Sequence, residues 1–324
     1  MKYTRRIQFT GGSTYTVSLP SRWVKKANLS KGSEIELSEL GSNLVLDPRS
    51  GGSSQKAKIL IISKSVEEPF LERIMTSLYI SYFDALTIKT EDIMDQKTRE
   101  TIKRFARRVM GVEIFEETSN SIVLQNVLNS ETFTVWNAIR RMSLNVDTMI
   151  SDGINAMKSI DRKMMFNIIE RDDEVDRYQW YIFRETKASQ ASGESNVYAL
   201  ILSRILERMA DHSVNICNAI IRAKKVNEKC LIALSEFLGS CYAMYKDSMS
   251  CFYSGNIEAM NAIIEKKKEV GQLKNNLLSS IDDDSLNLAT AVSEEILRIG
   301  LYSTDIAELG MDYLLANETS FEIR

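Results

Sequence analysis

The spacing of apolar residues divides the chain into three regions with different predicted secondary structure. In residues 1–49, short alternating runs predict strands at RRIQFT, TYTVSLP, EIELSEL and NLVLDP, with one short helix at SRWVKKANL. The segment SGGSSQ at residues 50–55 has the composition of a flexible linker. The first region is therefore predicted to be a small β domain that ends at residue 49.

Residues 56–129 mix strand and helix patterns. The strand-like runs KILIIS, ALTIKT, VEIFEE and SIVLQNV are interspersed with the amphipathic segments EEPFLERIMTSLYISYF and DQKTRETIKRFARRVM. Strands that alternate with helices predict a small α/β domain containing one βαβ unit. Neither helix is opened by a glycine-rich loop, so we do not expect a cradle for nucleotide phosphates here.

From residue 130 onward the strand patterns end and long helical patterns begin. Val135, Ile139, Met142, Val146 and Met149 recur at alternating steps of four and three, which is typical of a helix in a bundle. The same spacing returns further along the chain, in Leu234, Leu238, Cys241, Tyr245, Ser248 and Phe252.

An internal repeat accounts for this second helical pattern. IIERDDEVD matches IIEKKKEVG, and LERMADHSVNI matches ILRIGLYSTDI, in segments that begin at Ile168, Ile263, Leu206 and Ile296. Such self-similarity indicates a duplicated structural unit. We therefore predict an all-α tandem pair of three-helix bundles at residues 130–226 and 227–318, followed by a tail at 319–324.

Length and charge limit the class of protein. A chain of 324 residues is longer than a single core usually supports, so a multidomain fold is expected. Its net charge of −3 argues against nucleic-acid binding over the whole surface, so any DNA contact must be local. Neither a transmembrane segment nor an apolar leader is visible, and the four cysteines lack metal or redox spacing, so we expect a cytoplasmic protein with reduced thiols.

Two pairs of carboxylates stand out in the first repeat. Glu207 and Asp211 lie one turn apart in a helix that is otherwise apolar on that face, and Asp172 and Asp176 lie one turn apart in the preceding helix. If these helices pack antiparallel, the carboxylates converge. Two unit charges about 4 Å apart repel by about 4 kcal/mol at an effective dielectric near 20, so the cluster needs protons or a cation.

Oxygen ligands favour hard cations such as magnesium, manganese, calcium or ferric iron. The alternative is a solvated acidic stripe, paired with the neighbouring arginines Arg171, Arg177, Arg204 and Arg208.

The segments IIERDDEVDRYQ and LERMADHSVNICNAI together resemble the two signature helices of the PhoU family, phosphate-uptake regulators built from a duplicated three-helix bundle. The resemblance implies a metal cluster held by Asp172, Asp176, Glu207 and Asp211. Iron, zinc, magnesium and manganese are the candidate metals, and the identity stays open. His212 points about 100° away from Asp211 around the helix, so we expect it to pack or hydrogen-bond rather than to bind metal.

The second repeat departs from the family pattern at every one of these positions. The equivalent residues are Lys267, Gly271, Leu297 and Leu301. We therefore expect a metal cluster in the first repeat only.

The segment RRIQFTGGSTYTVSLPSRWVKKANLSKGSEIEL is similar to the AbrB/SpoVT-type swapped-hairpin DNA-binding domain. This region is basic within an acidic chain, so the resemblance predicts contact with DNA phosphates. So few strands cannot bury an apolar face alone, and swapped-hairpin domains interleave two copies, which implies a homodimer. The residues expected to contact DNA are Arg5, Arg6, Arg22, Lys25 and Lys26.

Two functions follow from these resemblances. The first is a phosphate-responsive transcriptional regulator, whose helical repeats sense state through metal, phosphate or a partner protein. The second is a signalling adaptor that contacts a phosphate ABC transporter or a sensor kinase, with the N-terminal domain used only to dimerise. We do not expect an enzyme, since a di-iron oxidase of bundle type needs Glu-x-x-His pairs from two helices and the chain has one histidine.

Overall fold

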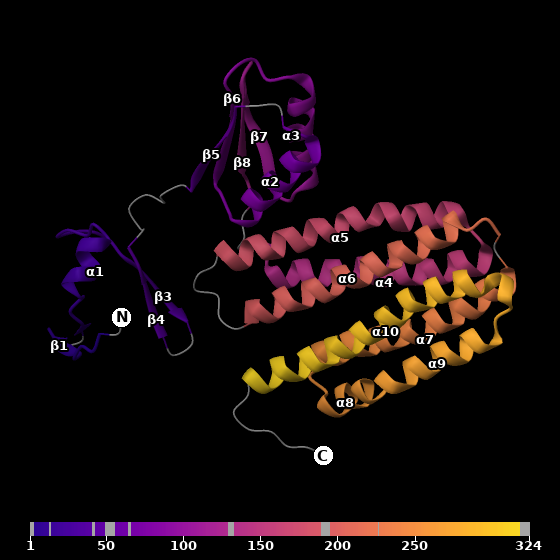
Figure 1. Cartoon of the computed structure of the whole chain (residues 1–324). Coiled ribbons are helices and arrows are strands. Elements are labelled where there is room, and N and C mark those ends of the chain that lie inside the picture. Colours follow the sequence, from indigo (N-terminus) through magenta and orange to yellow (C-terminus); the bar gives the residue numbers. More distant parts are fainter. Residues whose placement is uncertain are drawn as a thin grey trace. The chain divides into compact units, whose positions relative to one another are not determined.

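The multidomain fold expected from the sequence is confirmed by a computed structural model (Figure 1). The structure describes residues 3–12, 14–40, 43–48, 56–63, 66–128, 133–188, 195–225 and 227–317. It divides into two compact units, Met1–Lys56 and Ala57–Arg324. The predicted linker at 50–55 and the predicted tail at 319–324 lie outside the described residues.

The first unit consists of two antiparallel hairpins and a short helix. Its elements are β1 (Gln8–Thr10), β2 (Thr14–Thr16), α1 (Ser21–Lys26), β3 (Glu36–Leu40) and β4 (Asn43–Asp47). Phe9, Tyr15 and Leu44 on these strands are each more than half exposed. Strands this short therefore bury little core by themselves, as the sequence predicts.

The second unit begins with a four-stranded sheet of order β5-β6-β8-β7, in which β5 and β6 are parallel and the other pairs antiparallel. The elements are β5 (Ala57–Ile62), α2 (Glu68–Ile80), β6 (Ala85–Thr90), α3 (Gln96–Arg108), β7 (Val112–Glu117) and β8 (Ser121–Asn126). Leu86 and Ile88 on β6 are fully buried with Met75 of α2 and Ile102 of α3. Both helices therefore cover the same face of the sheet, which forms the predicted α/β layer.

Long helices make up the rest of this unit, and Figure 1 shows them lying alongside one another. The first repeat contains α4 (Val135–Ser159), α5 (Arg162–Ala188) and α6 (Ser195–Arg222). The second contains α7 (Glu228–Ser254), α8 (Ile257–Glu265), α9 (Lys267–Ser280) and α10 (Asp283–Asn317). One continuous apolar core runs through both repeats and includes the apolar residues that set the predicted helical spacing.

The middle helix of the second repeat differs from the sequence prediction, because it is interrupted at Lys266. The backbone N–H of Lys266 donates to the carbonyl of Ile263, three residues back, at 3.1 Å. This tighter turn ends the regular α-helical ladder, so α8 and α9 replace the single helix that corresponds to α5.

The α/β layer packs on the first repeat through α5. Arg184 of α5 is only 2% exposed, and its guanidinium lies over the rings of Tyr79 and Tyr82 at 4.9 Å and 5.1 Å. Arg184 and Tyr79 also both donate to the carbonyl oxygen of Met110, at 3.3 Å and 3.0 Å. These buried contacts tie the end of α3 and the start of β7 to α5.

We expect the close packing of α10 to be sensitive at Gly300. A Cβ atom there would lie 2.9 Å from Cys241 Sγ and 2.9 Å from Val270 Cγ1, so Gly300→Ala should lower the free energy of unfolding by about 1–3 kcal/mol. Gly271→Ala is the matched control, because a Cβ at this position in α9 meets no atom within 4 Å. It should be neutral or raise stability by up to about 1 kcal/mol. Urea unfolding of both variants checks the opposite signs.

Candidate functional site

The four carboxylates predicted from the sequence lie together on the facing sides of α5 and α6. Asp172 and Asp176 come from α5, while Glu207 and Asp211 come from α6. All four are partly buried, and their charges act on one another: Asp176, Asp211 and Glu207 each disfavour ionisation of Asp172. We call these residues the acidic face of the first repeat.

Burial of the acidic face raises the pKa values of its carboxylic acids. Desolvation, followed by repulsion from Asp176 and Asp211, raises the pKa of Asp172 to about 7. Desolvation raises the pKa of Asp176 to about 6, although the nearby Arg108 lowers it. The pKa of Glu207 is raised by desolvation and by Asp211. Near neutral pH the acidic face therefore either holds protons or needs additional positive charge.

Only some of the arginines that could neutralise this face do so. Arg204 and Arg208 of α6 approach Glu207, with nitrogen–oxygen distances of 3.6 Å and 3.8 Å. The other two candidates pair elsewhere, Arg171 with Asp152 and Arg177 with Glu174. The arrangement is thus partly buried and partly compensated, rather than a fully solvated stripe.

A further cation reaches the acidic face from the α/β layer and was not predicted from the sequence. Arg108, the last residue of α3, places Nη2 2.7 Å from Asp173 Oδ1 and 3.4 Å from Asp176 Oδ2. Its guanidinium carbon lies 4.9 Å from the centre of the Trp180 ring. The sequence shows only a basic end to a helix, and no local pattern indicates which distant carboxylates that end will meet.

The donor chemistry of the acidic face fits a hard cation, because all four predicted ligands are carboxylates. Glu207 Oε2 and Gln179 Nε2 are among the buried polar atoms that lack hydrogen-bond partners. Gln179 is 4% exposed, and its side chain lies beside Glu207, where it offsets part of the rise in the Glu207 pKa that desolvation causes. Within the described residues, however, no three Asp, Glu, His or Cys side chains already form a group that could hold one ion.

His212 turns away from the acidic face and joins the two repeats. Its Nδ1 lies 2.6 Å from Glu295 Oε2 of α10, and its ring packs 5.6 Å from that of Tyr302. Asn215 donates to the same carboxylate at 3.1 Å. The expectation that His212 packs or hydrogen-bonds is confirmed.

The five predicted DNA-contacting residues are all exposed in the first unit. Arg5 and Arg6 precede β1, and Arg22, Lys25 and Lys26 lie on α1. The guanidinium of Arg5 lies 5.9 Å from the centre of the Tyr3 ring. Their exposure is compatible with binding to phosphates.

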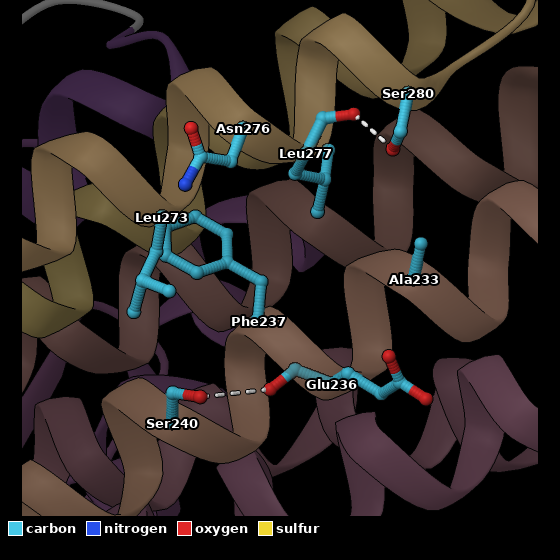
Figure 2. A pocket seen from close by; sticks show the side chains of 8 residues that line it. All are labelled: Ala233, Glu236, Phe237, Ser240, Leu273, Asn276, Leu277 and Ser280. Atoms are coloured by element: carbon cyan, nitrogen blue, oxygen red, sulfur yellow. Dashed lines mark hydrogen bonds between the residues drawn. The ribbon is translucent and has the colours of Figure 1, made fainter.

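A separate pocket of about 370 Å³ lies between α7 and α9 of the second repeat. Figure 2 shows Phe237 and Leu273 on its wall. Two hydroxyl groups on the wall already donate to backbone carbonyls of their own helices, Ser240 to Glu236 at 3.2 Å and Ser280 to Leu277 at 2.7 Å (Figure 2). The pocket includes none of the site residues predicted from the sequence.

The raised pKa of Asp172 makes the stability of the metal-free protein depend on pH. Because the folded-state pKa of about 7 lies above the ordinary aspartic acid value of 3.8, ionisation disfavours the folded state. The contribution of Asp172 to the stability of the fold is therefore present in full below about pH 4, and it is lost as the pH rises through about 7. With a chelator present, the stability of Asp172→Asn relative to the wild type should therefore increase between pH 5 and pH 8. Urea unfolding measures both proteins. Asp92→Asn, at an exposed position of the α/β layer, should keep the wild-type pH dependence.

No helix among the described residues combines the length and apolar character needed to cross a membrane. Family models match two parts of the chain: residues 139–220 match the PhoU domain, and residues 8–54 match the model described as antidote-toxin recognition MazE, bacterial antitoxin. A search of curated proteins finds no match.

Two solved structures of PhoU proteins are similar to this chain. PhoU from Pseudomonas aeruginosa has 16% sequence identity and a TM-score of 0.51, over 59% of this chain and 99% of that one. The phosphate transport system regulatory protein PhoU from Streptococcus pneumoniae has 17% identity and a TM-score of 0.49, over 58% and 96% of the two chains. The family matches and the fold of the Pseudomonas structure confirm the resemblance predicted from the motifs: residues 139–220, in the first repeat, are similar to the PhoU domain, and residues 8–54 are similar to the MazE antitoxin.

Proposed function

We propose that the chain is a phosphate-responsive regulator of phosphate uptake, which binds DNA as a homodimer and senses state through its helical repeats. The observation that carries this proposal is the combination of a PhoU match and a MazE match in one chain. The PhoU family, which the motifs of α5 and α6 resemble, regulates phosphate uptake. A DNA-binding segment attached to such a sensor would let the state of the sensor control transcription, so the proposed role is regulatory rather than catalytic.

The first unit supports the DNA-binding part of the proposal in two ways. Its five basic candidates, Arg5, Arg6, Arg22, Lys25 and Lys26, are exposed and can approach phosphates without burying charge. Its short hairpins also leave Phe9 and Tyr15 exposed, and a second copy of the chain would cover such side chains. Dimerisation would present two basic surfaces to a symmetric DNA site.

The acidic face supports the sensing part. We propose that Asp172, Asp176, Glu207 and Asp211 hold a metal cation, with iron, zinc, magnesium and manganese as candidates. A cation bound there would supply the positive charge that these half-buried carboxylates need near neutral pH. The second repeat has Leu297 and Leu301 in place of the α6 carboxylates, so the proposed centre belongs to the first repeat alone.

The DNA-binding proposal predicts a localised charge effect. Reversing Arg5, Arg6 and Lys25 to Glu should weaken DNA binding by at least about 100-fold and reduce the slope of log Kd against log salt by about 3. Helical content should not change, because these side chains are exposed. Fluorescence anisotropy with DNA from the promoter of the chain's own gene neighbourhood, at two salt concentrations, measures both effects.

The matched control reverses the charges of Lys97, Arg107 and Lys224 by substitution to Glu. These are exposed basic residues of the second unit, and their substitution gives the same change in net charge. This control should bind DNA as the wild type does. Equal DNA affinity in the wild type and the N-terminal variant would reject DNA binding through these residues. The adaptor function, with a transporter or sensor kinase as partner, would then account better for the chain.

The metal proposal predicts that Glu207→Leu together with Asp211→Leu abolishes bound metal while the fold survives. Survival is expected because Leu297 and Leu301 occupy the equivalent positions in the second repeat. Elemental analysis of protein purified without chelator measures the metal, and circular dichroism checks the fold. Glu170→Gln together with Glu174→Gln, at exposed positions of α5, is the control and should keep the wild-type metal content. The same metal content in the leucine variant and the wild type would contradict the proposed centre.

A further inference from the structure

Arg108 differs from the other arginines near the acidic face because it comes from another layer of the fold. Arg204 and Arg208 belong to α6 itself, whereas Arg108 ends α3 of the α/β layer. It contacts Asp173, Asp176 and Trp180, which all lie on α5. The α/β layer therefore places a positive charge directly beside one of the proposed metal ligands.

Arg108 divides one nitrogen between two acids and leaves another nitrogen without a partner. Nη2 lies 2.7 Å from an Asp173 oxygen and 3.4 Å from an Asp176 oxygen, while the buried Nε has no hydrogen-bond partner. The side chain is 36% exposed, so water can replace the carboxylates as its partner. An arginine held in this way can leave Asp176 at a modest cost in free energy.

Arg108 is also not the only residue that joins the α/β layer to α5 within the described residues. Arg184 already performs this role, since it is almost fully buried, lies over Tyr79 and Tyr82, and donates to Met110. Tyr79 donates to the same carbonyl. A purely structural role for Arg108 would duplicate this contact at a more exposed position.

A metal ion and Arg108 would compete for the same carboxylate. An Asp176 oxygen that coordinates a cation would bring that cation close to the guanidinium, and the two positive charges would repel each other. Among the described residues, no three possible metal ligands lie close enough together to hold one ion. In this arrangement Asp176 forms an ion pair with Arg108 instead.

We infer that Arg108 is a tethered counter-ion that competes with metal for Asp176, so that metal binding at the acidic face displaces the Arg108 side chain, at the end of α3, from α5. This inference rests on the metal centre proposed above. It assigns the α/β layer a regulatory role, because this layer then responds to whether the acidic face of the first repeat holds an ion.

The test uses manganese(II) as the probe and the ring of Trp180 as the reporter. The chain has three tryptophans, so Trp23→Phe and Trp136→Phe leave Trp180 as the only one. In this background, manganese should change the Trp180 emission as the guanidinium leaves the ring. Isothermal titration calorimetry gives the affinity, and hydrogen exchange of residues 96–108 reports whether the last turn of α3 loosens when Arg108 leaves Asp176.

Arg108→Gln should lower the manganese Kd by about fivefold, the effect expected for removal of one partly exposed ion pair that opposes binding. In this variant manganese should no longer speed exchange in α3. Arg107→Gln changes an exposed arginine one residue away and should keep the wild-type Kd. Circular dichroism should show the same helical content in all three proteins.

The outcomes separate this inference from the proposed centre. Equal manganese affinity in wild type and Arg108→Gln would overturn the competition and leave the metal centre standing. An equal decrease of the manganese Kd in Arg107→Gln and Arg108→Gln would show a general effect of charge. This result would also overturn the competition between Arg108 and metal. Failure of every protein to bind manganese would overturn both the centre and the role of Arg108.

Discussion

Carboxylates on the facing sides of two packed helices repel one another, and the structure must supply positive charge or protons wherever they meet. This constraint acts between α5 and α6, where burial raises the pKa of Asp172 to about 7 and that of Asp176 to about 6. Packed apolar side chains would meet no such difficulty. Keeping the carboxylates therefore lowers the stability of the metal-free fold, which is typical of residues retained for binding rather than for packing.

The two repeats respond to this constraint in opposite ways. The first keeps its acids and surrounds them with arginines, two from α6 and one from the α/β layer. The second replaces the α6 acids by Leu297 and Leu301, and it brings α10 close to α7 and α9 through Gly300. In the proposed function, the second repeat is therefore the scaffold, and the first repeat carries the charged groups that bind the metal ion.

Much of this arrangement could be predicted from sequence because it depends on local periodicity. Steps of three and four placed Ile139 and Met142 in the core, and the one-turn spacing of Asp172 and Asp176 put both on one face of α5. The contacts of Arg108 could not be predicted, because they depend on how the α/β layer packs against α5. The interruption at Lys266 was missed for a related reason, since the apolar pattern continues across it from Ile263 to Val270.

In the proposed function, the acidic face of the first repeat is a metal centre and the equivalent positions of the second repeat are not. Anomalous diffraction from crystals grown with manganese, recorded at the manganese absorption edge, distinguishes the two repeats. An anomalous peak is expected among the side chains of Asp172, Asp176, Glu207 and Asp211, and none beside Leu297 and Leu301. A fully ordered acidic face without a peak, or a peak of equal height in the second repeat, would contradict the proposed metal centre.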